Sequence, residues 1–359
     1  MAYRSIDLRK PSLDWLLVLV PVAAISDYGF HNDLLTFVTS ALAILPLAGL
    51  IGRATEQLAA HAGPKAGGLL NATFGNVAEL IISIFLILKG ELDVVKASLI
   101  GSIIGNLLLV LGLSLFVGGL RHPQQRYSRH AASVHSTSLT LAVTGLLMPA
   151  LFVLTSGSKE FAERETVSVV VAFVLIVLYG AALFFTMVTH EHLFRVPDEH
   201  EEPTWPRRRA VMALVGATAV TAWMAEILVG ALEPALKDLG LSKFFVGLIL
   251  VPIIGNAAEH STAVVFALKN RLDVTLEIAI GSSTQIALFV APLLVFISAA
   301  VGHPMSFVFN TFEIAAVGLS AVLVSLISQD GESNWLEGAQ LLGAYVIMAI
   351  SFFFVKQLA

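Results

Sequence analysis

Residues 75–110, GNVAELIISIFLILKGELDVVKASLIGSIIGNLLLV, recur in a recognisable form at residues 255–290, GNAAEHSTAVVFALKNRLDVTLEIAIGSSTQIALFV. The two stretches align without gaps at a constant offset of 180 residues, and fourteen of the 36 pairs are identical. A shared apolar composition explains matched leucines and valines, but it does not explain the matched Gly-Asn, Glu, Asp and Gly-Ser. The sequence therefore predicts an internal duplication in which the motif Gly-Asn-x-x-Glu occurs once in each half.

The composition indicates that lipid surrounds most of the chain. Of the 359 residues, 57% are hydrophobic and only 13% are charged, and the mean hydropathy is +0.84. A soluble domain is about 45–50% apolar and about 25% charged. The net charge of −5 argues against a nucleic-acid partner, which calls for a basic surface. The absence of cysteine excludes disulfides and thiolate metal sites.

Apolar stretches long enough to span a bilayer, which takes about 20 residues, occur eleven times. They are residues 14–30, 33–52, 66–89, 93–119, 131–154, 165–190, 210–232, 242–268, 272–299, 308–327 and 335–356. The offset of 180 maps the second span onto the seventh, so each repeat holds five helices. Because five is odd, the second repeat enters the membrane from the opposite side, as in many secondary transporters.

We therefore expect an all-α integral membrane protein with eleven transmembrane helices. Residues 1–32 carry an N-terminal helix, residues 33–190 the first inverted-topology repeat, and residues 210–359 the second. Residues 191–209 form a linker with an acidic run at 198–202 and three arginines at 207–209. A solvated linker with an arginine anchor is slightly favoured over a cation-sensing role for the acidic run.

The distribution of Lys and Arg predicts the orientation. Alternate loops counted from the N-terminus carry 14 of these residues on one side and 7 on the other, which together make the 21 of the chain. Since cytoplasmic loops are enriched in Lys and Arg, the N-terminus should be cytoplasmic and the C-terminus outside. A cytoplasmic cell membrane is the expected location, and the sequence leaves open whether the chain forms a homo-oligomer.

Glu79 and Glu259 lie deepest of all carboxylates in the predicted spans. An ionisable residue at that depth costs roughly 2.5–3.5 kcal/mol or more and marks a functional site. Asn76 and Asn256 precede them by three residues and share a helix face with them. Gly75 and Gly255, with Pro252 in the second copy, are expected to interrupt the helices and free backbone carbonyls for a cation.

Other acids in the spans are interpreted differently. Glu226, Glu277 and Glu313 each lie within about two turns of a predicted span end, where a side chain can reach the interface. We interpret these three as interfacial or structural acids. Two carboxylates, two amides and free carbonyls at the Gly-Asn-x-x-Glu motifs form an all-oxygen set, which suits a hard cation such as Ca²⁺.

Polar residues on the helix that follows each motif add secondary candidates. Ser102 and Asn106 share a face in the first half, and Ser282 and Gln285 do so in the second. Ligation and polar packing between helices are equally compatible with these four residues. His260 follows Glu259 and has Leu80 as its counterpart, so a structural hydrogen bond is favoured over ligation, with proton acceptance as an alternative.

Two carboxylates also offer a coupling chemistry, because a buried acid must be neutralised either by a cation or by protons. Competition for the same oxygens would give cation–proton exchange. An antiporter for Na⁺, K⁺ or Mn²⁺ and a gated cation channel remain alternatives on the residues alone. An intramembrane enzyme is disfavoured because the ten histidines lie mostly in loops or near span ends, and no cofactor is implied.

The doubled motif, the segment LLNATFGN at 69–76 and the segment GNAAEH at 255–260 resemble the cation/proton exchanger family, the Ca²⁺/H⁺ antiporter branch of the calcium/cation antiporters. The related sodium/calcium exchangers carry a Gly-Ser or Gly-Thr signature with a Pro before the acid, which this sequence lacks. The resemblance implies that Glu79 and Glu259 alternately bind Ca²⁺ and protons, with Asn76 and Asn256 beside them. It implies polar partners at Ser102, Asn106, Ser282 and Gln285.

Overall fold

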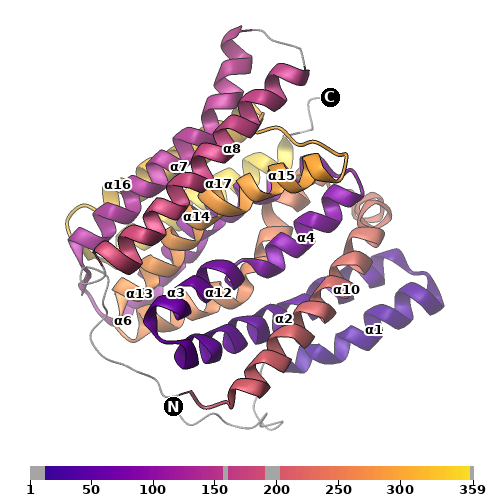
Figure 1. Cartoon of the computed structure of the whole chain (residues 1–359), viewed down its shortest axis with the longest axis horizontal. Coiled ribbons are helices and arrows are strands. Elements are labelled where there is room, and N and C mark those ends of the chain that lie inside the picture. Colours follow the sequence, from indigo (N-terminus) through magenta and orange to yellow (C-terminus); the bar gives the residue numbers. More distant parts are fainter. Residues whose placement is uncertain (1–12, 157–160, 191–202, 356–359) are drawn as a thin grey trace.

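The computed structural model describes residues 13–156, 161–190 and 203–355, and these are almost entirely helical (Figure 1). The acidic run at 198–202 lies outside the described residues. Nine helices in the described ranges are long and apolar enough to cross a membrane, and α4 (Val77–Leu88) and α16 (Thr311–Ile327) are shorter apolar helices. The prediction of an all-helical membrane architecture is therefore confirmed at this level.

The first half of the chain begins with a helix formed by η1 (Leu13–Val18), α1 (Leu19–Ile25) and η2 (Ser26–Phe30). It continues with α2 (Asp33–Ala62), α3 (Pro64–Phe74), α4 and the helix formed by α5 (Leu92–Ile104), η3 (Gly105–Val110) and α6 (Leu111–Arg121). After them come α7 (Arg129–Ser156), α8 (Phe161–Phe184) and η4 (Phe185–Thr189).

The second half begins with α10 (Arg207–Leu239), followed by the helix formed by α11 (Lys243–Phe245), η5 (Val246–Leu250) and α12 (Val251–Leu268). The next helix comprises α13 (Leu272–Leu276), η6 (Glu277–Gly281), α14 (Ser282–Gln285), η7 (Ile286–Val290) and α15 (Ala291–Ala300). The half ends with α16 and α17 (Trp335–Phe354). The π-helical turns η3 and η7 lie at matching places in the two repeats, and such turns often mark functional sites.

The helices form two groups around a buried middle (Figure 1). The first group comprises α1, α2 and α10, with α10 packed along α2, and it lies at the lower right of the view. The second comprises α7, α8 and α16 at the upper left, with α6 packed against α17. The segments that carry the two motifs, α3, α4 and α12, lie between these groups.

Several helix ends follow from local sequence. Gly63 has φ 82° and Pro64 occupies the first turn of α3, so the chain turns sharply between α2 and α3. Gly240 has φ 65° and ends α10. Asn310 and Glu313 form a reciprocal capping box at the start of α16, which explains why Glu313 is buried as a structural acid, as predicted.

Two predicted spans are longer in the structure. The span predicted at 33–52 belongs to a helix that continues to Ala62, and the span predicted at 210–232 belongs to one that continues to Leu239. The helix end and the predicted span end therefore differ, and the position of Glu226 relative to the membrane interface stays a prediction. Glu226 lies near the middle of α10 and is exposed, because the polar residues beyond position 232 extend the helix rather than end it.

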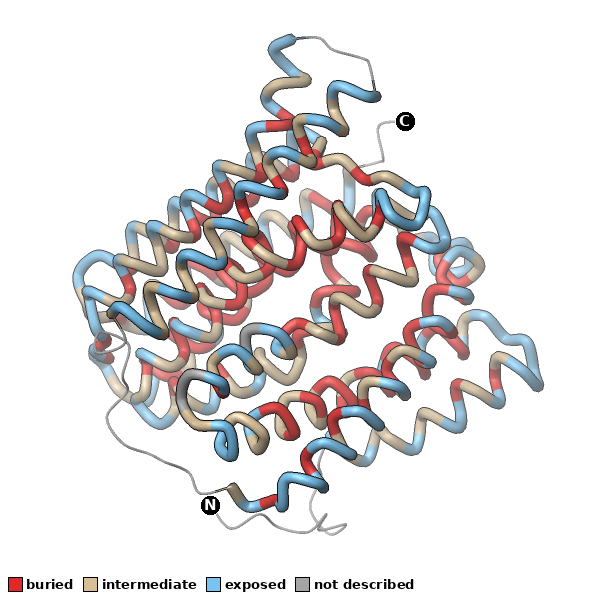
Figure 2. The backbone as a smooth tube through the Cα atoms, viewed as in Figure 1, coloured by how far each residue is buried: buried red, intermediate tan, exposed pale blue. Residues whose placement is uncertain are grey.

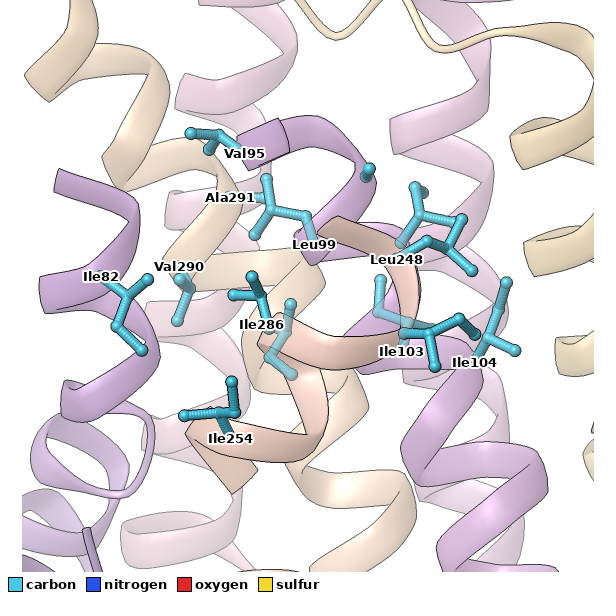
Figure 3. Close-up of a cluster of buried hydrophobic side chains, with 14 of the residues drawn as sticks. Ile82, Val95, Leu99, Ile103, Ile104, Leu248, Ile254, Ile286, Val290 and Ala291 are labelled. Carbon is cyan, nitrogen blue, oxygen red and sulfur yellow. The ribbon is translucent and has the colours of Figure 1, made fainter. Parts of the chain in front are cut away.

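The core joins the two halves. Figure 2 shows the middle helices as largely buried and the outer faces as exposed, and the exposed faces carry many large apolar side chains, as expected for contact with lipid. Figure 3 shows the centre of this core, with side chains from both halves of the chain: Ile82, Val95, Leu99, Ile103, Ile104, Leu248, Ile254, Ile286, Val290 and Ala291. Burial of apolar area from both repeats favours one compact body over two independent ones.

One short pair of strands lies outside the helices. β1 (Gln125–Arg126) pairs antiparallel with β2 (Glu332–Ser333). The Nε2 of Gln125 also donates to the carbonyl of Ala267 at 2.8 Å. The loop after α6 is thereby fixed to the loop before α17 and to the end of α12.

Candidate functional site

The first motif lies at a break between two helices. α3 ends at Phe74 and α4 begins at Val77, and Asn76 between them has φ −101° and ψ 22°. The Gly75 amide still bonds to the carbonyl of Asn71 at 2.8 Å, and the Leu80 amide bonds to the carbonyl of Asn76 at 3.0 Å. The expected interruption at this motif is therefore present, and it directs Asn76 out of the helix that precedes it.

The second motif differs, and the expected interruption at Gly255 is wrong. α12 runs without a break from Val251 to Leu268, and the irregular π-helical turn η5 lies before it. Pro252 has no amide hydrogen, so it cannot donate the α-helical bond to the carbonyl of Leu248 four residues earlier. That carbonyl faces Gly101 of α5, where a Cβ would lie only 2.0 Å from the oxygen. The Leu248 carbonyl thus packs against a neighbouring helix instead of lining the motif.

The two motifs pack against each other. A Cβ at Gly255 would lie 3.4 Å from the Cβ of Glu79, and a Cβ at Gly75 would lie 3.5 Å from Oε1 of Glu259. Each glycine therefore lies in direct contact range of the glutamate of the other half. Residues 180 positions apart in the sequence are brought into one cluster, as the matched motifs suggested.

Two serines connect the halves through a crossed pattern of hydrogen bonds. Ser102 donates to Oε1 of Glu79 in its own half, and Nδ2 of Asn256 donates to Ser102 at 3.2 Å. Ser282 hydrogen-bonds to Oε2 of Glu259 at 2.9 Å and to Oδ1 of Asn76 at 3.1 Å. Each serine thus binds the glutamate of its own repeat and the asparagine of the other.

The remaining predicted residues lie around this cluster. Nδ2 of Asn106 donates to Ser282 at 3.2 Å, and its Oδ1 lies 3.2 Å from Nε2 of His260. The structure therefore gives His260 the hydrogen-bonding position that the sequence favoured. Gln285 forms a hydrogen bond with Tyr179, and its Oε1 would lie 3.8 Å from a Cβ at Gly75.

The burial of the two acids is unequal. Glu79 is fully buried, whereas Glu259 is half-buried and Gly75 beside it is exposed. Neither acid forms an ion pair with a basic side chain of the described residues, and Oε2 of Glu79 has no hydrogen-bond partner there. Glu259 is close enough to act electrostatically on Glu79. Two adjacent negative charges in this environment require compensation by a bound cation or by protons.

The chemistry of the cluster suits a hard cation. The two glutamates, Asn76, Asn256 and the two serines supply eight side-chain oxygens, and the chain has no cysteine to supply a thiolate. Ca²⁺ takes six to eight oxygens at about 2.3–2.6 Å, with carboxylates, amides and water all serving as ligands. The number and type of these oxygens are therefore compatible with a hard cation.

The family model for the sodium/calcium exchanger protein matches residues 32–188 and 209–354, which is most of the chain. The chain belongs to the sodium/calcium exchanger family. The Ca(2+)/H(+) antiporter of Aphanothece halophytica is 42% identical over 355 residues, which cover 94% of this chain and 95% of that protein. The Ca(2+)/H(+) antiporter ChaA of Bacillus subtilis is 44% identical over 340 residues, which cover 93% and 96%.

Solved structures agree with this family membership. The structure of native YfkE matches with a TM-score of 0.85 at 40% identity, covering 96% of this chain and 100% of that one. The H+/Ca2+ exchanger CAX matches with a TM-score of 0.76 at 16% identity, covering 95% and 91%, which is a likeness of fold. The resemblance to the Ca²⁺/H⁺ antiporter branch is confirmed, and this member of the family is a multi-pass membrane protein.

Sequence reasoning missed Tyr179 in α8. It bonds to Gln285 and stacks on Phe289, with ring centroids 5.1 Å apart. The available signal was a phenol group in an otherwise apolar span, although nothing in the sequence paired it with residue 285. Gly101 was noted only as one of the matched glycines, and its close approach to Leu248 follows from packing alone.

Proposed function

We propose that this chain exchanges Ca²⁺ for protons across a membrane by alternating access. The observation that carries the proposal is the crossed cluster of Glu79 and Glu259, two acids that lack a basic partner among the described residues. The negative charge of such a site must be balanced either by a cation or by protons. Ca²⁺ and protons compete for the same carboxylate oxygens, so binding of one displaces the other. The relatives named Ca(2+)/H(+) antiporters, at 42–44% identity, support Ca²⁺ as the cation.

The proposed architecture has eleven membrane crossings. Nine helices of the described residues qualify by length and composition; α16 and the broken pair α3–α4 would supply the other two. The inverted repeats are residues 33–190 and 210–359, each with five crossings, after an N-terminal segment at 1–32. The crossed bonds of Ser102 and Ser282 support this symmetry, since each serine plays the same part in its own half.

The proposed orientation places the N-terminus in the cytoplasm and the chain in the cell membrane. With that orientation, α3 and the C-terminal part of α12 lie on the cytoplasmic side of the motifs, so the exposed Gly75 and the half-buried Glu259 would be approached from there. Ile82, Leu99 and Leu248 belong to the buried apolar core (Figure 3) and would separate the cluster from the outside. We infer a state open to the cytoplasm, in which Ca²⁺ from inside reaches Glu259 first.

The exchange follows from this arrangement. Ca²⁺ enters beside Glu259, draws Glu79 and the two asparagines into its oxygen shell, and displaces the protons that compensated the acids. Opening to the outside exposes the same oxygens to external protons, which compete with Ca²⁺ and release it. Hydrogen bonds from Ser102 and Ser282 keep each carboxylate in place while its charge partner changes.

Reconstituted vesicles test this proposal. We expect a pH jump to drive Ca²⁺ uptake against a Ca²⁺ gradient, and Glu79→Gln and Glu259→Gln each to abolish it in protein that still inserts. Glu277→Gln is the matched control, because Glu277 is exposed and lies outside the cluster; it should transport normally. Flux that runs only down the gradient would indicate a channel, and near-normal uptake by either cluster variant would refute the site assignment.

Cation selectivity is tested in the same vesicles. An excess of Na⁺, K⁺ or Mn²⁺ should leave proton-driven uptake of radioactive Ca²⁺ substantially intact if Ca²⁺ is the preferred cargo. Stronger inhibition by one of these ions than by an equal concentration of unlabelled Ca²⁺ would assign that ion as the preferred cargo instead.

A further inference from the structure

A polar groove runs between α7 and α16, which pack along each other in the second helix group (Figure 1). Its volume is about 680 Å³, which is in the range of small-molecule sites. Of the ten residues that line it, Leu141 is the one without a hydrogen-bonding side chain. Helices that face lipid gain nothing from such a lining, so it favours an occupant that carries polar groups.

Three hydroxyls of the groove lack partners. The Oγ atoms of Ser136, Ser325 and Ser328 are buried and form no hydrogen bond with any described residue. Ser328 as a whole is only 2% exposed. Buried polar groups are nearly always hydrogen-bonded, so these three hydroxyls are available to an occupant of the groove once their side chains rotate toward it.

The charge of the groove favours an anion. Arg129 lines it at the start of α7 and forms no ion pair with a described residue. No aspartate or glutamate is among the lining residues. The first turn of α7 adds little to this preference, because the amides of Ala131 and Ala132 already donate to Ser128, and the carboxylate of Asp273 accepts from the Ser128 amide at the same helix end. Gln329 lies at the same end and offers a neutral donor beside the guanidinium.

The groove becomes apolar with distance from Arg129. The hydroxyls of Thr137, Thr140 and Thr144 donate to the carbonyls four residues earlier in α7, so their methyl groups are left for an occupant. Leu141 lies among them. At 1.5 Å per residue, the distance along α7 from Arg129 to Thr144 is about 22 Å. A cationic end, a middle of unpaired hydroxyls and an apolar end match the phosphate, the glycerol esters and the acyl chains of a phospholipid.

We propose that the groove between α7 and α16 binds one anionic phospholipid, with its phosphate at Arg129 and its acyl chains along the threonine methyl groups. Arg129 belongs to the side of the chain richer in Lys and Arg, so the lipid comes from the leaflet on that side. The site is separate from the cluster of Glu79 and Glu259. The bound lipid would give the helix group of α7, α8 and α16 a fixed partner in the bilayer.

Native mass spectrometry of the full chain in detergent tests the proposal, with phosphatidylglycerol as the probe. We expect one saturable phosphatidylglycerol adduct, and binding weaker by at least about five-fold in Arg129→Gln, the factor that loss of one charge near a membrane surface implies. Arg121→Gln is the matched control, since Arg121 is an exposed arginine at the end of α6 outside the groove. Equal loss of binding in both variants would overturn the proposal.

A second pair of variants keeps the charge and fills the space. Leu141→Trp should block the adduct, whereas Leu154→Trp, an exposed position on the same helix outside the groove, should not. This pair decides the question even where Arg129→Gln fails to fold. Unchanged phosphatidylglycerol binding in Leu141→Trp would overturn the proposal.

Two further outcomes identify other occupants. If glycerol phosphate binds as tightly as phosphatidylglycerol, the ligand is a soluble phosphate. If phosphatidylcholine binds as tightly as phosphatidylglycerol, the negative charge of the lipid headgroup plays no part in binding. A groove variant that changes the oligomeric mass and leaves lipid binding unchanged would mean that a second copy of the chain covers the groove. Each of these results overturns the lipid assignment.

Discussion

Gly101 and Gly281 are equivalent in the aligned repeats, yet the structure predicts opposite results when each is changed to alanine. A Cβ at Gly101 would lie 2.0 Å from the carbonyl oxygen of Leu248 and 2.6 Å from its carbon. A Cβ at Gly281 would meet nothing closer than the Cγ of Glu277 at 4.0 Å. The first substitution therefore forces two backbones apart, and the second fits the space already present.

The loss of stability expected for Gly101→Ala follows from these distances. α5 and η5 must separate by about 1.4 Å before the new Cβ reaches ordinary contact at 3.4 Å from the Leu248 oxygen. Overpacking of this kind costs about 1–3 kcal/mol, which outweighs the gain of about 1 kcal/mol from alanine over glycine within a helix. Ser102 is the next residue, so the same shift stretches its 3.2 Å bond with Asn256 beyond hydrogen-bonding distance.

Two measurements check the prediction. Thermal unfolding of Gly101→Ala in detergent should show a lower midpoint than wild type, and proton-driven Ca²⁺ uptake in vesicles should fall by more than ten-fold. Gly281→Ala should keep or slightly raise the wild-type midpoint, because alanine is favoured over glycine within a helix, and it should keep uptake within two-fold of wild type. The reasoning is refuted if Gly101→Ala behaves as wild type, or if both variants are damaged to the same extent.

Three further predictions concern single contacts. Ser282→Ala should weaken Ca²⁺-dependent transport about five-fold or more, because it leaves buried partners unpaired. Ser283→Ala, which loses a bond to Ala279 and a 3.5 Å contact with the Ile103 carbonyl, neither of them to the cluster, should not; equal effects would contradict the crossed pattern. Asn310→Ala should lower the free energy of unfolding by about 1 kcal/mol through loss of a helix cap, measured by thermal unfolding. The 2.8 Å ion pair of Lys243 with Glu91 is partly exposed, so a double-mutant cycle should give a coupling of no more than about 1 kcal/mol.

Much of the fold was predictable because lipid imposes simple rules. Helices are required wherever the backbone crosses a bilayer, so a run of about 20 apolar residues is enough to predict one. The helix ends were less predictable. Polar residues ended the predicted span at position 232, whereas α10 continues to Leu239, because charged side chains are compatible with a helix that leaves the membrane.

The residues of the candidate site could be selected from the sequence, but the hydrogen bonds between them could not. Depth in the spans singled out Glu79 and Glu259, and spacing placed Asn76 and Asn256 beside them. The partner of each serine could not be read from spacing, since Ser102 bonds to Asn256 across 154 residues and Ser282 to Asn76 across 206. Such bonds depend on how the two halves pack, and no local rule of sequence specifies that packing.

The sequence by itself determined that the Gly-Asn-x-x-Glu motifs are related and that their acids lie within apolar helices, because a fixed offset and hydropathy are properties of the chain alone. Only the tertiary structure decided how the two copies differ. The helix breaks at Gly75 and continues through Gly255, and the irregular turn of the second copy lies before the motif, at η5, where the carbonyl of Leu248 packs on Gly101. The matched residues of the two motifs thus differ in local structure, because each motif packs against the other half of the chain and the two halves are not identical.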